Sequence, residues 1–597
     1  MTKLKKLLLL AGLAWAGSAA AAGNEPPVVS AGVYRGVVPV AKFDVSPPLR
    51  DMKPLPVPSG PLLIGRAMVD PPSGLEWIYT PGPQSPDLIV QSLIGTRGAI
   101  PNPTVSFNAQ NNISGVNPPD PAGDVGPNHY VAMSNLSLQI FNKSGTSMFG
   151  PVFTNTLWSG FGGACETQNS GDPIVVHDQF ADRWLITQFT ATAVAGQFFN
   201  CVAISQTPDP TGTYFRYAFT TGANFPDYPK YGVWSDAYVI STREFAGNTF
   251  AGVGAYAVNR AQLIAGNPTP TVISFLVAPG AAAFNTGDGL LPADIDGTNL
   301  PPAGSPNYFV GSMDAGGPYS APQDALTLWK FVINFTTPAS SSFTLTNTIP
   351  IAAYDTIFPC SGRACIPQPG TTALVDILSY RQRPLNRLVY RNFGTHESLV
   401  TNQSVEAVAG IAGIRWWEIR NPNTSPVVHQ EGTFAPGATD GTHRWMGSMA
   451  MDSSGNMALG YSASNATTVF PSVWYTGRLV TDPLGQMSQG EGQIHNGTGS
   501  NTGGGNRWGD YTSMNVDPTD DCTFWYVNQH TPVTSASGWQ LRVGSFRFAE
   551  CGSPTFTLGL AEASRTLCAG PTVNVNVNVG AIAGFNSPVA LSSTGQS

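Results

Sequence analysis

Short runs of apolar residues, separated by turn residues, fill the chain from about residue 120 onward. The turns are rich in Gly, Pro, Asn and Asp, and the runs between them have the length and composition of β-strands. Within this region, helical periodicity is confined to Asn259 to Ala265 (NRAQLIA), where we predict one short helix. The pattern predicts an all-β fold.

Seven segments of this region share one sequence pattern: a strand, then a turn at an Asp or Asn, then a returning strand rich in aromatic residues or Leu. They span 123–135, 171–189, 230–242, 304–314, 373–392, 444–462 and 507–528, and their starts lie between 48 and 74 residues apart. This spacing suits four-stranded blades with long loops. We predict a β-propeller of seven four-stranded blades over residues 118–552, with an array of β-sandwiches as the alternative.

The two ends of the chain differ from this region. Residues 1–22 have the pattern of a secretory signal, with lysines at 3, 5 and 6, an apolar run and an Ala-Ala-Ala cleavage site. The apolar run is too short for a membrane anchor. Residues 23–117 are Pro-rich, which predicts an extended leader that packs on the main domain in places. The sequence therefore predicts a secreted protein, located outside the bacterial envelope.

The tail, residues 553–597, alternates with period two, as half-buried strands do. It resembles the opening of Ig-like modules that are appended to secreted bacterial proteins. An Ig-like sandwich needs about 100 residues, so this would be a partial, truncated module. We expect a fragment, and the alternative is a tail that pairs with a partner chain.

Charge narrows the classes of partner. The chain has 29 basic and 37 acidic residues, and removal of the signal takes away three of the basic ones. A protein this acidic, without a basic run, is a poor binder of nucleic acid or anionic membranes. No later stretch is long and apolar enough to predict a transmembrane segment. An extracellular glycan or a surface protein is the expected partner.

The seven cysteines fit an oxidising compartment. Proximity favours three disulfides, although six cysteines allow fifteen connectivities. The favoured pairs are Cys165 with Cys201, Cys360 with Cys365, and Cys522 with Cys551. Zinc is less favoured at the second pair, because no further Cys or His pair lies nearby. Cys568 is left without a predicted partner.

Four segments carry a resemblance to a known family: GDVGPNHYV, GDPIVVHDQFADRW, YPKYGVWSDAYVIS and NRWGDYTSMNVDPTDDCTFWYVNQ. Together they resemble secreted bacterial proteins with a sialidase-like β-propeller, most of them uncharacterised. The resemblance covers roughly residues 117–550. It implies the fold and export, and it implies no activity.

A propeller places the first residues of each innermost strand around one mouth of its central channel. This predicts a shared opening lined by residues from several blades: Asp124, Asp172, Lys230, Asp236, Arg444, Arg507, Asp510 and Tyr511. Glycosidases use paired carboxylates, and sialidases use a Tyr nucleophile with an arginine cluster. The catalytic candidates are Asp172, Asp510 and Tyr511, and the other five are binding candidates. Arg381 or Arg383 would supply a third arginine. The alternative is that these charges clamp the blades together.

Other motifs point to structure rather than chemistry. Asp178, Asp452 and Asp517 are expected to bond their own turns. No HExxH motif or His cluster predicts a metal site, and no cofactor is expected beyond a loop calcium near Asp294 and Asp296.

The sequence leads to a main hypothesis of a secreted β-propeller that binds an extracellular glycan or surface protein without catalysis. The alternative is a glycoside hydrolase of sialidase type, or a polysaccharide lyase, with its site at the channel mouth.

Overall fold

The structure is a computed structural model of the chain. It describes residues 30–54, 66–67, 86–280, 282–360, 363–378, 381–503, 506–552, 555–560, 577–582 and 587–589. The predicted signal, Cys568 and most of the predicted Ig-like tail lie outside the described residues. Within the described part, no helix combines the length and apolar character that a membrane span needs.

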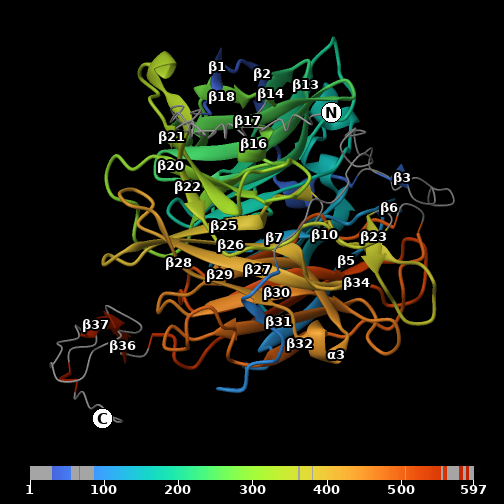
Figure 1. Cartoon of the computed structure of the whole chain (residues 1–597). Helices are drawn as coiled ribbons and strands as arrows, with labels where there is room; N and C mark the ends of the chain where they lie inside the picture. Colours follow the sequence, from blue (N-terminus) through green and yellow to red (C-terminus); the bar gives the residue numbers. More distant parts are fainter. Residues whose placement is uncertain are drawn as a thin grey trace, which may run out of the picture.

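The fold is all-β and propeller-like, and most strands fall into seven sets that follow one another along the chain (Figure 1). Set 1 contains β7 (Ala122–Val125), β8 (His129–Ser134), β9 (Ser137–Asn142) and β10 (Ser147–Phe153). Set 2 contains β11 (Val175–Asp178), β12 (Arg183–Phe189), β13 (Phe198–Ser205), β14 (Tyr214–Gly222) and β2 (Val40–Val45). Set 3 contains β15 (Phe225–Val233), β16 (Ala237–Ala246), β17 (Thr249–Asn259), β18 (Val272–Val277) and β1 (Val33–Val37).

The second half of the chain continues the same order. Set 4 contains β19 (Leu291–Ile295), β20 (Asn307–Met313), β21 (Ala325–Val332) and β22 (Ser342–Pro350). Set 5 contains β25 (Leu385–Asn392), β26 (Glu397–Val408), β27 (Ile411–Arg420), β28 (Val427–Phe434) and β4 (Val90–Gln91). Set 6 contains β29 (His443–Met451), β30 (Met457–Ser464), β31 (Ser472–Arg478) and β32 (Glu491–His495). Set 7 contains β33 (Ser513–Val516), β34 (Phe524–His530), β35 (Gln540–Phe546) and β5 (Val105–Asn111).

Three two-stranded sheets complete the strands. They are β3 (Arg66–Ala67) with β6 (Val116–Asn117), β23 (Ala364–Ile366) with β24 (Val375–Asp376), and β36 (Thr555–Leu560) with β37 (Val577–Ile582). The short helices are α1 (Ala164–Thr167), α2 (Arg260–Ile264), α3 (Gly437–Asp440), η1 (Leu49–Asp51), η2 (Thr154–Trp158), η3 (Ala283–Asn285) and η4 (Pro338–Ser340). Helix α2 confirms the predicted helix, and the Asn259 side chain caps it by accepting the Gln262 N–H at 3.0 Å.

The first strands of the seven sets contact one another in a cycle. The order of contacts is β7, β11, β15, β19, β25, β29 and β33, and β33 in turn contacts β7. Between sets 4 and 5 the contact is a parallel hydrogen-bonded ladder, so these two sets form one nine-stranded sheet. Because the first strands themselves form this cycle, side chains near their starts come from distant parts of the sequence and meet at one place.

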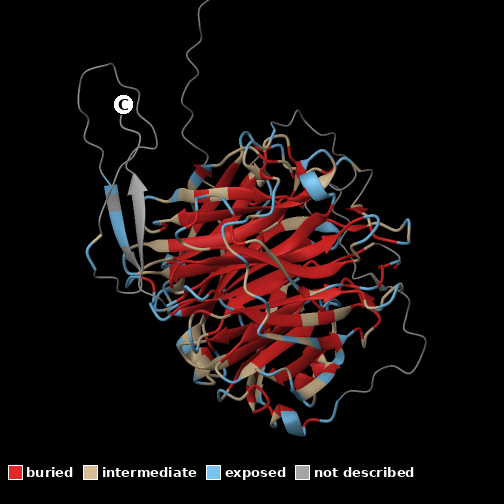
Figure 2. Ribbon diagram, turned by 90° about the horizontal axis from the view of Figure 1, so that it is seen from below, coloured by how far each residue is buried: buried red, intermediate tan, exposed pale blue. Residues whose placement is uncertain are grey.

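Burial on both faces explains why the strands appear as continuous apolar runs rather than as alternating ones. In β12 every residue after the first is buried, and in β29 all residues are buried. Figure 2 shows the buried residues following the strands and the exposed residues gathering in peripheral loops. A strand covered by neighbouring sheets on both sides has no solvent face to mark with polar residues.

Strand β5 completes set 7 although it lies in the segment predicted as a leader. It pairs antiparallel with β35, with Phe107 opposite Val543. Its Phe107 ring lies 4.9 Å from that of Phe141 in set 1. The segment predicted as a leader also supplies β1, β2 and β4 as outermost strands of sets 3, 2 and 5.

Replacement of Phe107 by Ala tests whether β5 helps to hold set 7 against set 1. We expect the free energy of unfolding to fall by about 1–3 kcal/mol, because a half-buried aromatic contact between sets 7 and 1 is lost. Asn108→Ala is the control on the same strand, since its exposed bond to Arg542 contributes about 0–1 kcal/mol. Urea denaturation of both variants measures the difference, and equal losses would contradict the role given to β5.

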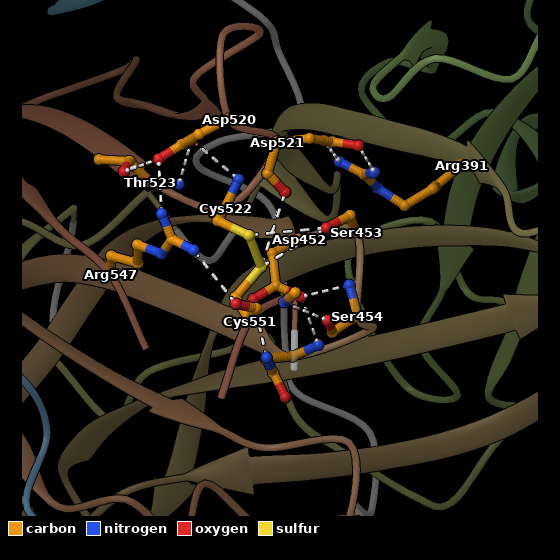
Figure 3. Close-up of a disulfide and its surroundings, with 12 residues drawn as sticks. Arg391, Asp452, Ser453, Ser454, Asp520, Asp521, Cys522, Thr523, Arg547 and Cys551 are labelled. Carbon is orange, nitrogen blue, oxygen red and sulfur yellow. Dashed lines mark hydrogen bonds and ion pairs between the residues drawn. A yellow bond between two sulfur atoms is a disulfide. The ribbon is translucent and has the colours of Figure 1, made fainter. Parts of the chain in front are cut away.

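The structure contains three disulfides, and they join the same cysteines that sequence proximity favours. Cys522–Cys551 links the turn between β33 and β34 to the segment after β35 (Figure 3). The Asp520 carboxylate accepts the Cys522 N–H at 3.0 Å and pairs with Arg547 at 3.2 Å. This bridge therefore ties the turn between β33 and β34 to the chain that leaves β35.

Removal of this bridge by Cys522→Ser with Cys551→Ser is expected to lower the free energy of unfolding by about 3–4 kcal/mol, the loss estimated for a loop of this size. The matched control is Cys360→Ser with Cys365→Ser, because those cysteines are only five positions apart and a short loop loses less entropy on closure. Thermal unfolding of both double variants makes the comparison, and a larger loss in the control contradicts it.

Candidate functional site

The starts of the innermost strands share an unusual backbone conformation. Six of the seven sets place a non-glycine residue with positive φ within three residues of the first residue of that strand: Asp120, Asp172, Tyr228, Gln382, Met446 and Asp510, at 47°, 44°, 51°, 45°, 53° and 71°. The left-handed region costs such residues about 1–2 kcal/mol each. Strained conformations of this kind gather where a site is held in a fixed geometry.

Eight buried side chains meet at these strand starts, and we call them the acid–base cluster: Asp120, Asp172, Tyr228, Lys230, Arg383, Arg507, Asp510 and Tyr511. They come from the starts of sets 1, 2, 3, 5 and 7, and each is less than 9% exposed. Asp120 also donates its backbone N–H to the Gly509 carbonyl at 3.0 Å, which ties sets 1 and 7 together at this point.

Lys230 lies at the centre of the cluster. Its ammonium nitrogen is 3.1 Å from the ring centroid of Tyr228 and 3.5 Å from that of Tyr511. The two aromatic faces stabilise a cation between them. The Tyr511 hydroxyl donates to the Asp172 carboxylate at 2.9 Å, and the Tyr228 hydroxyl donates to the Asp510 carbonyl at 2.9 Å. The rings therefore connect the lysine to two carboxyl-bearing turns.

Two arginines complete the cluster. The Arg383 guanidinium carbon is 3.3 Å from the Tyr228 ring centroid, and the same guanidinium donates to Asp288 at 2.8 Å. Arg507 pairs with Asp510 and lies 3.6 Å from Asp376 at the end of β24. Five residues predicted from the sequence, namely Asp172, Lys230, Arg507, Asp510 and Tyr511, thus come together.

Burial shifts the protonation of the central groups. It raises the pKa of Asp172 to about 7, with the nearby Asp227 carboxylate adding to the rise. Burial also raises the pKa of Asp120, and one carboxyl oxygen of this residue has no hydrogen-bond partner. Burial lowers the pKa of Lys230 well below its usual value, and Arg383 lowers it further. The cluster therefore contains carboxyl groups able to hold a proton at neutral pH.

A small cavity adjoins the cluster. It has a volume of about 10 Å³ and is lined by residues that include Tyr228, Arg243, Leu290 and Arg383. This is about the space that one water molecule needs.

Three predicted binding residues lie outside the cluster. Arg444 pairs with Asp440 and Glu491 at 2.9 and 2.8 Å within its own part of the chain. Asp236 is exposed in the turn after β15, beyond the far end of that strand. Asp124 accepts the His177 N–H at 2.7 Å, and burial raises its pKa to about 7.

Sequence reasoning missed Asp120 and Tyr228 and left Arg383 as one of two choices for a third arginine. The local signal for Asp120 is present, because Asp120-Pro121 and Asp172-Pro173 open two successive innermost strands in the same way. Tyr228-Pro229 takes the same place in set 3. The polar residue before proline, at the start of an apolar run, marks these positions.

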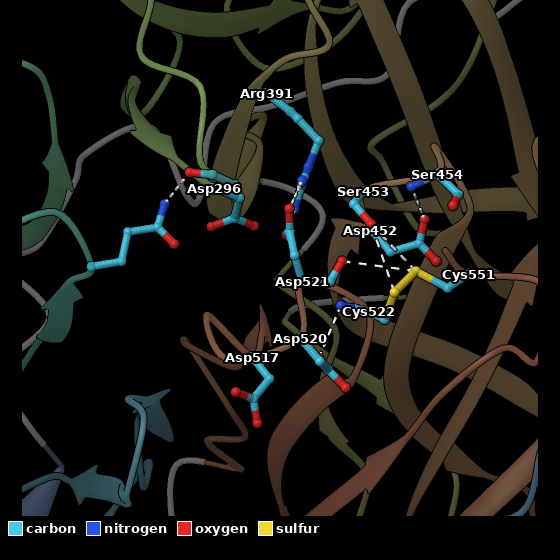
Figure 4. A network of polar contacts seen from close by, with 12 residues as sticks. Asp296, Arg391, Asp452, Ser453, Ser454, Asp517, Asp520, Asp521, Cys522 and Cys551 are labelled. Atoms are coloured by element: carbon cyan, nitrogen blue, oxygen red, sulfur yellow. Dashed lines mark hydrogen bonds and ion pairs between the residues drawn. A yellow bond between two sulfur atoms is a disulfide. The ribbon is translucent and has the colours of Figure 1, made fainter. Parts of the chain in front are cut away.

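The acidic turns at the other ends of the strands are structural. Asp178, Asp452 and Asp517 each accept N–H groups of their own turn, which confirms the interpretation as turn residues. Figure 4 shows Asp452 and Asp517 near Asp521, which pairs with Arg391 at 2.7 Å. These carboxylates already have protein partners.

The predicted calcium ligands meet a different arrangement. Asp294 and Asp296 both bind the guanidinium of Arg387 at 2.6 Å, so both carboxylates have a protein partner.

No family model matches the chain, and no curated protein matches it in sequence. Among solved structures, it is similar to an endo-arabinase from Bacteroides thetaiotaomicron at 12% identity, over 53% of this chain and 95% of that one, with a TM-score of 0.27. The α-L-arabinofuranosidase Arb93A of Fusarium graminearum matches at 8% identity, over 77% and 99%, with a TM-score of 0.31. An α-L-arabinanase of Penicillium chrysogenum, complexed with arabinobiose, matches at 8% identity, over 76% and 98%, with a TM-score of 0.29.

These findings correct the main functional hypothesis. All three structures are named as arabinan- or arabinoside-degrading enzymes, which fits the glycoside hydrolase alternative better than the main hypothesis of a binding propeller without catalysis. None of the three is named as a sialidase, so the predicted sialidase-like family is not shown. At 8–12% identity no activity transfers to this chain.

The protonation of Asp172 gives a pH-dependent prediction for Asp172→Asn. The raised pKa of the folded carboxyl, about 7 against 3.8, contributes stability at low pH that is lost as the pH rises through about 7. The uncharged amide has no such dependence. We therefore expect the free energy of unfolding of the variant, relative to that of the parent, to increase between pH 4 and pH 8. Urea denaturation at pH 4, 6 and 8 measures this difference, and a constant difference contradicts it.

Proposed function

We propose that the protein is a glycoside hydrolase whose reacting groups belong to the acid–base cluster. The observation that supports this most is the buried Asp172 carboxyl, with its pKa raised to about 7 and its oxygen bound by the Tyr511 hydroxyl. Glycoside hydrolysis needs one carboxylic acid that is protonated at working pH and a second carboxylate. Asp510 and Asp120 provide further carboxyl groups in the same cluster.

The roles follow from the partners of each group. Asp172 acts as the general acid that protonates the leaving oxygen, and Tyr511 positions it. Asp510, paired with Arg507, is the second carboxylate and either activates water or attacks the sugar. Lys230 lies between the two tyrosine rings, and its amino group interacts electrostatically with Asp172 and Asp510.

Access to the cluster sets the choice of substrate for the test. Each of its side chains is less than 9% exposed, and the adjoining cavity holds about one water. A substrate reaches Asp172 only if the turns around the strand starts move apart. Small aryl glycosides are therefore better first probes than polysaccharides.

The architecture that we propose for this enzyme is a seven-bladed propeller with each strand set as one blade. The cyclic contacts of the seven first strands support it. We also propose that the protein is secreted, and the three disulfides support an oxidising compartment.

Asp172→Asn, with Tyr511→Phe as a milder change, tests the proposed function. We expect Asp172→Asn to lower kcat by at least about 100-fold, because general acid catalysis contributes factors of about 100 to 10,000. Tyr511→Phe should lower kcat less and shift the basic limb of the pH profile, because that limb reports deprotonation of the general acid that Tyr511 contacts. A panel of aryl glycosides, with arabinosides included, gives the rates.

Asp236→Asn is the control, since Asp236 is exposed in the turn at the far end of β15. Its activity should equal that of the parent. If no glycoside is hydrolysed, or Asp172→Asn retains full activity, the proposal fails. Products with a new carbon–carbon double bond would indicate a lyase instead.

A further inference from the structure

Two histidines meet at the junction of sets 6 and 7, away from the acid–base cluster. His495 is the last residue of β32, and His530 is the last residue of β34. Their ring centroids are 4.1 Å apart, and the rings are inclined by 58°. The pair therefore bridges two strand sets that are neighbours in space.

His530 is a buried imidazole with unsatisfied polar atoms. It is 2% exposed, and neither of its ring nitrogens has a hydrogen-bond partner in the structure. A neutral imidazole has one donor and one acceptor nitrogen, and leaving both unpaired in the interior is costly. Orphaned buried groups of this kind call for an unseen water or ion.

The imidazole of His495 provides a second nitrogen ligand for a cation. His495 is partly exposed, so it opens the pair to solvent and provides a route of entry. Burial lowers the pKa of His530 to about 3 and also lowers that of His495, with Arg542 adding to both shifts. The ring nitrogens of His530 have no other partner and lie beside the His495 ring, so the pair can offer imidazole nitrogens to a metal.

We propose that His495 and His530 form a binding site for a divalent transition metal of the kind that prefers imidazole, with Cu²⁺ or Zn²⁺ as the cation. Imidazole nitrogen suits both metals, and Cu²⁺ binds most tightly among the divalent ions of the first row. Among the described residues, no group of three or more metal-ligating side chains occurs. Water completes the coordination, so the expected affinity is that of a two-ligand site.

The site would join the last strand of set 6 to the second strand of set 7. A metal that binds only the folded chain stabilises it in proportion to the logarithm of its concentration. Saturating Cu²⁺ or Zn²⁺ should therefore raise the melting temperature of the full chain. This inference does not depend on the proposed hydrolase activity.

The experiment uses the full chain without a histidine tag, titrated with Cu²⁺ or Zn²⁺ by calorimetry, with electron paramagnetic resonance of the copper form. We expect a site that binds one metal ion with nitrogen hyperfine splitting. His495→Gln and His530→Phe should each weaken binding at least tenfold and abolish the thermal shift. Arg542→Gln should strengthen binding, because a nearby positive charge is removed.

His396→Gln is the matched control, because His396 stacks on Phe393 at 4.8 Å and one of its ring nitrogens bonds the Thr395 hydroxyl at 3.0 Å. It should bind metal as the parent does. Should His530→Phe fail to fold, the partly exposed His495→Gln decides the question alone. The proposal is overturned if the parent binds no metal, or if His495→Gln binds it unchanged.

Discussion

The pairing of β5 with β35 is the interaction on which the arrangement of the other sets depends. It places a strand from residues 105–111 beside one from residues 540–546, and Phe107 carries the contact on into set 1. Without this ladder, sets 1 and 7 would each present an unpaired or poorly covered edge. The first strands contact one another in a cycle, so a defect at this seam loosens the packing against both neighbours.

The same geometry explains why charged residues are buried in this protein. Strands covered on both faces bring side chains from five sets together at the strand starts, where water is excluded. A lysine, two arginines and three aspartates gather there, each less than 9% exposed. The desolvation cost of such charges is large, and mutual pairing offsets only part of it. Burial accordingly raises the pKa of the Asp172 carboxyl and lowers that of the Lys230 ammonium.

Much of this organisation was predictable from the sequence, and the reasons for the misses are physical. Apolar runs and turn residues predicted the all-β fold and the short helix at Asn259, because both patterns are local. Asp172 and Tyr511 were found because they begin apolar strands. Arg444 was misplaced because one of its two carboxylate partners, Glu491, lies 47 residues away, and the sequence does not show that pairing. The strand at 105–111 was hidden because its partner lies at the other end of the sequence.

The pairing of β5 with β35 also affects when each strand finds its partner during synthesis. The Thr104 hydroxyl bonds the Ser545 carbonyl across 441 positions of sequence. During synthesis from the N-terminus, β5 emerges long before its partner β35. It therefore has no partner until nearly all of the later strands have been made. Contacts so distant along the chain form slowly, because the entropy of closing the loop is lost before strand pairing can stabilise the structure. In that interval β5 is an unpaired edge strand, the kind of surface that pairs readily with other chains.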